Sequence, residues 1–207
     1  MAIIASWNIN SVRIRVDILK KFIEEINPDI ILLQEIKCTD EEFPDFYASF
    51  GYELIVNGQK GKYGVATLLK KGLNFKSIEL KNEILSCESR TNFIYVNEYN
   101  LNILNVYTPN GNPIEDKNKF NFKIEWLSEI EKISTHFINN VDNLLIAGDF
   151  NVLENKNDVL NFDDWTNDAL GCIESRTIFR KILSSGLTNI VRTVSYTHLT
   201  LPTTWSV

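Results

Sequence analysis

The stretch "DIILLQE" (29–35) is an apolar run that stops at a glutamine and a glutamate. Its uninterrupted aliphatic residues, without polar alternation, predict a buried strand. "AIIASWN" (2–8) predicts a second buried strand of the same kind. Between them, "VDILKKFIEEI" (16–26) places Ile18, Phe22 and Ile26 at the spacing of an amphipathic helix, and Asn27-Pro28 ends it. This strand–helix–strand order indicates a sheet covered by helices.

The rest of the chain continues to alternate strand-like and helix-like segments. Strands are predicted in "GYELIVNG" (51–58), "YGVATLLKKG" (63–72), "NFKSIEL" (74–80), a hairpin over 92–110, and "NLLIAGDFN" (143–151). Helices are predicted over 120–138 and 177–187, the first with Ile124, Leu127, Ile130 and Phe137 on its apolar side. No repeat or linker interrupts the pattern, so we expect one α/β domain.

Composition sets the broad class of the protein. The chain has 207 residues, 44% of them hydrophobic, and no apolar run near the roughly 20 residues of a membrane helix. We find no signal-peptide pattern, and the three cysteines show no CxxC spacing, so a cytoplasmic protein that does not enter a membrane is expected. The net charge of −6 argues against a partner bound by bulk basic charge. Lysine clusters at 20–22, 59–64, 68–72 and 117–123 are either a local basic rim or ordinary solvated side chains.

Several predicted strands deliver polar residues at the point where they stop. These are Asn8 and Asn10, Glu35, Tyr107 and Asn110, and Asp149 and Asn151. Functional sites gather beyond strand ends in sheet-based folds, because the scaffold fixes the side chains there. The alternative is that each is an ordinary turn former, an interpretation that suits Asn10 and Asn110 better than Glu35.

These groups share one chemistry. Carboxylates Glu35 and Asp149 and amides Asn8 and Asn151 are hard oxygen ligands that suit Mg²⁺ or Mn²⁺ and disfavour zinc. No Ser-His-Asp or Cys-His set and no phosphate-binding P-loop motif is found. A hard cation, a carboxylate base and a phenol indicate metal-assisted hydrolysis of a phosphate ester.

Six sequence blocks contain these residues or lie between them: "SWNINSVR" (6–13), "DIILLQEIK" (29–37), "GQKGKYGVATLL" (58–69), "LNVYTPNG" (104–111), "KFNFKIEWL" (119–127) and "IAGDFNV" (146–152). In this order they resemble the exodeoxyribonuclease III type of abasic-site (AP) DNA endonuclease, within the endonuclease/exonuclease/phosphatase superfamily. The resemblance implies a four-layer α/β sandwich, two sheets flanked by helices. It also implies a Mg²⁺-dependent DNA repair phosphodiesterase that cleaves at abasic sites and trims 3′ ends.

The resemblance also implies a role for each matching residue. Glu35 is expected as the principal metal ligand with Asn8 beside it, and Asp149 and Asn151 as the groups that activate or hold the attacking water, near the metal. Tyr107 and Asn110 are expected at the scissile phosphate. The residues expected along the DNA are Asn10, Arg13, Lys37, Lys62 and Tyr63. From the residues alone, a plain tight hairpin is the alternative for the segment "GQKGKYGVA" (58–66). The expected partner is duplex DNA with abasic sites or 3′ ends, bound by a monomer.

The C-terminal residues depart from the family pattern. The resemblance implies further strands and an Asp-His pair after residue 193, and neither His136, inside a predicted helix, nor His198 fits that pair. Residues 194–203, "VSYTHLTLPT", match one reading frame of a transposase-type sequencing adapter. We therefore expect an incomplete domain over 1–193 that is marginally stable, with the activity of the truncated chain left open, and a non-native tail over 194–207. Two other functions stay open, a superfamily phosphatase or phosphodiesterase on a non-DNA substrate and a non-catalytic DNA-binding remnant.

Overall fold

The computed structural model describes residues 2–140 and 143–194, which fall into two compact units. The first unit comprises residues 1–108 and 142–150, and the second comprises 109–141 and 151–207. The chain leaves the first unit after the seventh strand and re-enters it for the eighth. Each unit is described by itself below.

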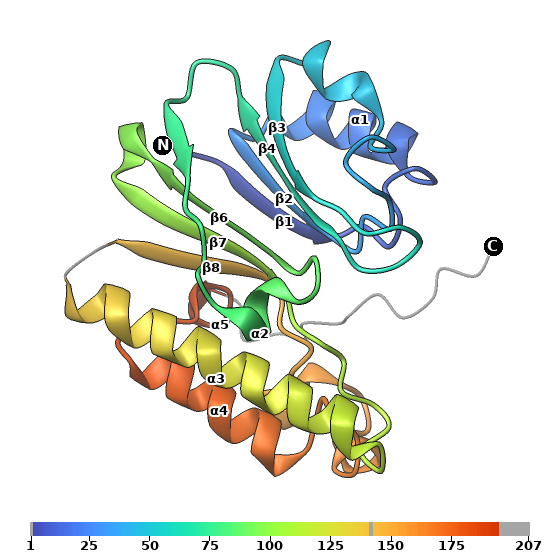
Figure 1. The fold of residues 1–207 in the computed structure, drawn as a ribbon, viewed down its shortest axis with the longest axis vertical. Coiled ribbons are helices and arrows are strands. Elements are labelled where there is room, and N and C mark those ends of the chain that lie inside the picture. Colours follow the sequence, from blue (N-terminus) through green and yellow to red (C-terminus); the bar gives the residue numbers. More distant parts are fainter. Residues whose placement is uncertain (1, 141–142, 195–207) are drawn as a thin grey trace. The chain divides into compact units, whose positions relative to one another are not determined.

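The first unit holds two four-stranded mixed sheets (Figure 1). One sheet has the order β1-β2-β4-β3 and consists of β1 (Ile4–Asn8), β2 (Ile30–Gln34), β4 (Val65–Lys70) and β3 (Tyr52–Asn57). The other has the order β5-β6-β7-β8 and consists of β5 (Phe75–Ser77), β6 (Thr91–Val96), β7 (Leu101–Tyr107) and β8 (Leu144–Asp149). The pairs β1/β2 and β7/β8 are parallel, and the other neighbours are antiparallel.

The two sheets face each other across an aliphatic core. Ile30, Leu32 and Leu69 of the first sheet pack against Ile94 and Ile103 of the second. Every residue of β2 is buried, as its apolar sequence predicts. The strand predicted over 2–8 is present as β1, but its predicted burial is wrong, because β1 is the outer strand of its sheet and its residues are half-buried or exposed.

Helix α1 (Val16–Ile26) covers the other face of the first sheet. The helix is predicted correctly, but its predicted apolar face is wrong in two positions. Leu19 and Ile23 are the buried residues, whereas Ile18 and Ile26 are 58% and 46% exposed. The face that packs on the sheet therefore follows the spacing of Leu19 and Ile23. The first unit also contains η1 (Asp45–Ala48), α2 (Glu83–Ser86) and η2 (Asn97–Tyr99).

The second unit is built on two long helices that pack side by side, α3 (Lys117–Asn139) and α4 (Ile173–Ser184) (Figure 1). Asp116 caps α3 by accepting a hydrogen bond from the backbone N–H of Lys119 at 3.3 Å. Leu127 and Ile130 are buried as predicted, while Ile124 and Phe137 are only half-buried. The remaining elements are η3 (Lys156–Asp158), η4 (Phe162–Trp165) and α5 (Ile190–Val194).

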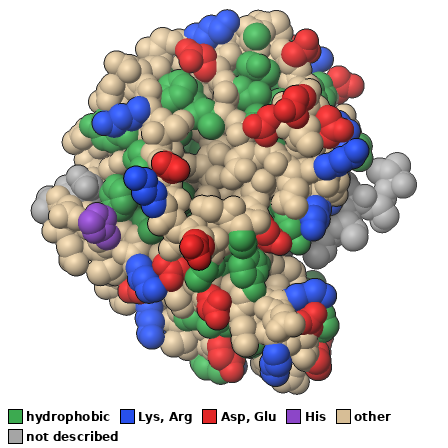
Figure 2. All heavy atoms as spheres, in the orientation of Figure 1, with side chains coloured by type: hydrophobic (Ala, Val, Ile, Leu, Met, Phe, Trp, Pro, Cys, Tyr) green, Lys and Arg blue, Asp and Glu red, His purple; other side chains and the backbone are tan. Residues whose placement is uncertain are grey.

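Two expectations from the sequence concern the ends and surface of the chain. The tail expected over 194–207, with His198, lies outside the described residues apart from Val194, the last residue of α5. Within the described ranges, no helix has the length and apolar character needed to cross a membrane. His136, the histidine that the structure describes, is exposed on α3 (Figure 2).

Candidate active site

The two parallel strand pairs bring four of the predicted residues to strand ends. In the first sheet the register sets Asn8 opposite Gln34, and Glu35 follows directly. In the second sheet it sets Tyr107 opposite Asp149. The carboxyl ends of parallel strands lie at the same edge of a sheet, so each pair of polar groups shares an edge.

A hydrogen bond connects the two sheets at these ends. The Tyr107 hydroxyl donates to Oε1 of Glu35. Burial, and then this hydrogen bond, raise the pKa of Tyr107 well above its usual range. The phenol is therefore held protonated as a hydrogen-bond donor. Glu35 has φ 54°, in the left-handed region that non-glycine residues seldom adopt, which costs about 1–3 kcal/mol and is common at functional sites.

A second hydrogen bond joins Asn8 to Asp149. Nδ2 of Asn8 donates to Oδ2 of Asp149 at 2.8 Å. The other end of the amide, Oδ1 of Asn8, accepts from the backbone N–H of Asn10 at 3.1 Å. An amide oxygen has two lone pairs, so Oδ1 keeps acceptor capacity beyond this bond. The amide orients the carboxylate and presents a hard oxygen of its own.

A buried polar pair lies directly beneath these groups. Nε2 of Gln34 donates to Oδ1 of Asn105 at 2.8 Å, and Nδ2 of Asn105 donates to the carbonyls of Leu33 at 3.2 Å and Ala66 at 3.0 Å. Both side chains are almost fully buried between the sheets. A satisfied buried polar pair fixes the register of the layers it joins. The pair therefore sets how the strand ends that carry Glu35 and Tyr107 meet.

Basic groups flank Glu35. Nζ of Lys37 lies 3.3 Å from Oε2 of Glu35 and donates to Oδ1 of Asn10 at 2.6 Å. Arg13 donates to the carbonyl of Lys37 at 3.2 Å. These side chains border a hollow of about 350 Å³ lined by Asn10, Ser11, Arg13, Ile14, Arg15, Lys37 and Gly61. Three of the five residues predicted along DNA, Asn10, Arg13 and Lys37, thus form one cluster.

The other two are Lys62 and Tyr63, and Tyr63 contacts an arginine that was not predicted. The guanidinium of Arg90 stacks 3.9 Å from the ring centre of Tyr63 and 4.9 Å from that of Tyr107. Arg90 is 4% exposed and pairs with Glu88 at 2.5 Å. Nζ of Lys62 lies 5.0 Å from the Tyr63 ring centre. A single arginine in a charged stretch gives no sequence signal, because only folding brings it against both rings.

Asn110 and Asn151 belong to the second unit, where an unpredicted lysine holds their backbone. Nζ of Lys123 donates to the carbonyls of Asn110 at 3.0 Å and Asn151 at 2.6 Å. Lys123 is fully buried. Its spacing was a usable signal, because it precedes Trp126, Leu127 and Ile130 by three, four and seven residues and so shares their helix face.

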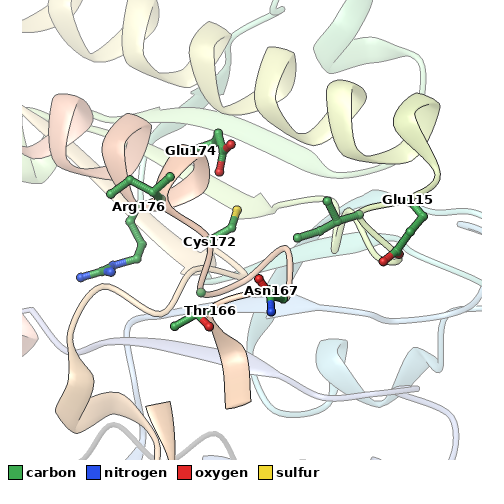
Figure 3. Close-up of a pocket in the computed structure, with 9 residues that line it drawn as sticks. Glu115, Thr166, Asn167, Cys172, Glu174 and Arg176 are labelled. Atoms are coloured by element: carbon green, nitrogen blue, oxygen red, sulfur yellow. The ribbon is translucent and has the colours of Figure 1, made fainter. Parts of the chain in front are cut away.

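A hollow in the second unit contains none of the predicted residues. It measures about 500 Å³ and is lined by Ile114, Glu115, Thr166, Asn167, Gly171, Cys172, Ile173, Glu174 and Arg176 (Figure 3). The lining side chains mix both charges with apolar groups and do not converge on one point. This hollow therefore carries no chemistry comparable to the strand ends of the first unit.

The strand ends offer few carboxylate groups as metal ligands. Across residues 2–140 and 143–194, no group of three or more His, Cys, Asp or Glu side chains could hold a metal. The predicted ligand set has two carboxylates, Glu35 and Asp149, and amide oxygens for the rest. Such all-oxygen sets suit hard cations, which keep several water ligands, rather than zinc.

Two facing mixed sheets, with carboxylate, amide and phenol groups at their strand ends, define an α/β sandwich with a hydrolase-like site. Residues 5–206 match the model described as the Endonuclease/Exonuclease/phosphatase family. The chain belongs to this family. The family and the α/β-sandwich fold indicated by the sequence are thereby confirmed.

Named proteins are similar to this chain in sequence or in structure. Exodeoxyribonuclease III of Haemophilus influenzae is 32% identical over 155 residues, which covers 71% of this chain and 56% of that protein. The chain thus spans little more than half the length of this curated relative. An AP endonuclease from Archaeoglobus fulgidus has a similar structure, with a TM-score of 0.84, 28% identity, and coverage of 93% of this chain and 74% of that one.

A third similar structure contains nucleic acid. It is a 3′ phosphatase from Neisseria bound to a product DNA hairpin, with a TM-score of 0.83 and 25% identity, covering 96% of this chain and 76% of that one. The names of all three relatives are those of phosphoester hydrolases. The family assignment therefore supports the phosphate-ester chemistry inferred from the residues.

Proposed function

We propose that this protein is a Mg²⁺-dependent DNA repair phosphodiesterase, an AP endonuclease and 3′-5′ exodeoxyribonuclease. The observation that carries the proposal is the pair of hydrogen bonds Tyr107–Glu35 and Asn8–Asp149 at the ends of four strands. They fix a phenol, an amide and two carboxylates in one region of the first unit. Phosphodiester hydrolysis needs such groups, because charge develops on both the attacking and the leaving oxygen.

Each group has a defined part in the proposed reaction. Tyr107, kept protonated by its raised pKa, donates a hydrogen bond to a phosphate oxygen or to the leaving oxygen. Asp149, oriented by Asn8, accepts the proton of the attacking water or orients that water. Asn110 and Asn151 are assigned by sequence position and resemblance alone, Asn110 to a phosphate oxygen and Asn151 to the water or phosphate. The roles of Asn110 and Asn151 in the reaction are proposals.

The residues present fit a hard divalent cation. Glu35 is the proposed principal ligand with Asn8 beside it, and Asp149 and Asn151 complete the proposed set. When bound, Mg²⁺, or Mn²⁺ in its place, polarises the phosphate and neutralises developing negative charge. Lys37, which pairs with Glu35 at 3.3 Å, holds that carboxylate in place.

The proposed substrate is duplex DNA with an abasic site or a free 3′ end. Support comes from Arg13 and Lys37 at the hollow of about 350 Å³ and from Lys62 beside Tyr63. In the proposed complex these cations contact phosphates, and such contacts position a duplex without reading its sequence. The net charge of −6 does not oppose this, because the cations are local to the site. We further propose that the protein acts as a monomer in the cytoplasm, where its three cysteines, all free in the structure, stay reduced.

One observation favours a second activity. The similar Neisseria structure is named as a 3′ phosphatase, and removal of a 3′ phosphate uses the same water activation at a DNA end. A phosphatase acting on non-DNA phosphates and a non-catalytic DNA-binding protein are the alternatives that a substrate panel must separate. The panel contains an abasic-site duplex, a blunt duplex, a 3′-phosphate duplex and an inositol phosphate.

The first test is nicking of a duplex with one abasic site by the 207-residue chain, with Mg²⁺ and with EDTA. Glu35→Ala, prepared identically, is the control for contaminating nuclease. Nicking that requires Mg²⁺ and is lost in Glu35→Ala supports the proposal. A wild-type chain that binds the duplex but does not nick it under any metal condition contradicts the proposed activity for this chain.

A further inference from the structure

Lys123 is a fully buried cation whose contacts are main-chain carbonyls of the second unit. Its Nζ donates to the carbonyl oxygens of Asn110 at 3.0 Å, Asn151 at 2.6 Å and Ala169 at 2.8 Å. An ammonium has three N–H donors, and burying one is costly unless those donors are bonded. These three bonds help to offset the cost of burying the Lys123 ammonium.

The three carbonyls come from three separate segments, around residues 110, 151 and 169. Further hydrogen bonds tie the segments together: Oδ1 of Asn112 accepts from the backbone N–H of Ala169 at 2.9 Å, and the N–H of Leu153 donates to the carbonyl of Leu170 at 2.8 Å. Lys123 lies at the point where all three segments meet. Removing its ammonium would leave three carbonyls without that donor at once.

The loop that carries Asn110 passes directly over the lysine stem. A Cβ atom built on Gly111 would lie 2.6 Å from Cδ of Lys123 and 3.2 Å from Cβ of Ala169. Real side chains do not approach so closely, so only glycine fits between them. The lysine stem thus limits how closely this loop approaches α3. The absence of a side chain at Gly111 allows that close approach.

We propose that Lys123 is a positioning residue that sets the backbone of Asn110 and Asn151, and through it the reach of their side-chain amides. The inference rests on the proposed function, which gives these two amides a part in the reaction. A misplacement of about 1 Å from a change outside the chemistry can cost about 10²-fold in rate. Lys123 touches the backbone of both residues and acts through them.

The test compares Lys123→Met with Lys123→Arg. Methionine keeps the length of the stem and removes the ammonium, while arginine restores a buried cation with several donors. We expect Lys123→Met to lower kcat for abasic-site nicking by about 10–100-fold with little change in KM, and Lys123→Arg to recover part of the loss. Ile130→Val, on the same buried face of α3, is the matched control and is expected to leave kcat unchanged.

A combined variant asks whether Lys123 acts through Asn110 and Asn151. If it does, Lys123→Met added to the Asn110→Ala/Asn151→Ala pair should lose about as much kcat as that pair alone. Independent roles would multiply the two losses, because separate effects add in free energy. Multiplied losses would overturn the proposal, as would a kcat of Lys123→Met equal to that of Ile130→Val.

A second readout does not depend on activity. In ¹⁵N-labelled protein, the side-chain amide signals of Asn110 and Asn151 should shift or broaden in Lys123→Met and stay in place in Ile130→Val. Unchanged signals in Lys123→Met would overturn the positioning role whatever the nuclease assay gives. If the wild-type chain does not nick DNA, the proposed function fails, and the amide signals still decide what Lys123 does.

Discussion

The hydroxyl of Tyr107 donates a hydrogen bond to Oε1 of Glu35, and this bond joins the end of β7 in one sheet to the end of β2 in the other. Two residues 72 positions apart in the sequence are thereby brought into direct contact. The bond uses one oxygen of Glu35, and Lys37 lies 3.3 Å from the other. The carboxylate is thus oriented from both sides before any substrate arrives.

Tyr107→Phe tests the role of the phenol. We expect kcat for abasic-site nicking to fall by about 10²–10³-fold, the usual effect of removing one donor to developing charge. Single-turnover nicking rates at saturating DNA measure this. Tyr95→Phe is the matched control, because it also removes a hydrogen-bonded phenol hydroxyl, 2.7 Å from Asn100 Oδ1, away from the strand ends. A Tyr107→Phe protein as fast as Tyr95→Phe would exclude the phenol from the reaction.

Asn8→Ala tests the orientation of Asp149. The change removes the amide that donates to Oδ2 of Asp149 at 2.8 Å. Loss of a group that orients a reacting or metal-binding carboxylate typically costs about 10–100-fold in activity or metal affinity. We expect a loss of that size and a higher Mg²⁺ concentration for half-maximal nicking. Asn143→Ala, which removes an exposed amide bonded to the carbonyl of Asn100 at 3.0 Å, should leave both quantities unchanged. Equal Mg²⁺ curves for wild type and Asn8→Ala would argue against this role.

Gly148→Ala tests the close packing of β8 on β7. A Cβ atom at Gly148, where φ is +144°, would lie 2.0 Å from the carbonyl oxygen of Val106. Backbone atoms within a sheet cannot move aside cheaply, so we expect a loss of at least about 2 kcal/mol in the free energy of unfolding. Gly72→Ala is the control for backbone strain alone, since φ is +97° there and no atom lies within 4 Å. Urea denaturation of both variants gives the comparison, and equal losses would mean that the contact with Val106 is unimportant.

Tyr52 should make stability depend on pH in the alkaline range. Its side chain is buried and its hydroxyl donates to the carbonyl of Pro28; burial, and then the charge of Asp29, raise the pKa of Tyr52 from 10.0 to about 12. The folded state therefore holds the proton more tightly than the unfolded state. This contribution to stability is complete below about pH 10 and is lost as the pH rises from about 10 to 12.

Urea midpoints measured across that range check the prediction, with Tyr52→Phe as the reference. The variant has no ionisable hydroxyl, so its stability should fall less steeply with pH than that of the wild type. Parallel curves for the two proteins would show that Tyr52 ionises as readily in the folded chain as in the unfolded one.

The secondary structure followed from local patterns that need no tertiary information. The aliphatic run over 29–35 became the wholly buried β2, and the alternating segments over 92–110 became the hairpin of β6 and β7. Errors arose where burial depends on a neighbour. Ile18 and Ile26 of α1 are exposed, and β1 is an outer strand, because the periodicity of a segment does not say which elements cover it.

The sequence by itself determined the family, the two-sheet class and the candidate residues at strand ends, because each strand must stop where its apolar run stops. Only the tertiary structure decided which of these residues touch. It paired Tyr107 with Glu35 and Asn8 with Asp149, brought Arg90 against two tyrosine rings, and selected the three carbonyls to which Lys123 donates. Such contacts depend on strand order, register and the packing of layers, which bring together side chains that are far apart along the chain and leave no periodic trace in it.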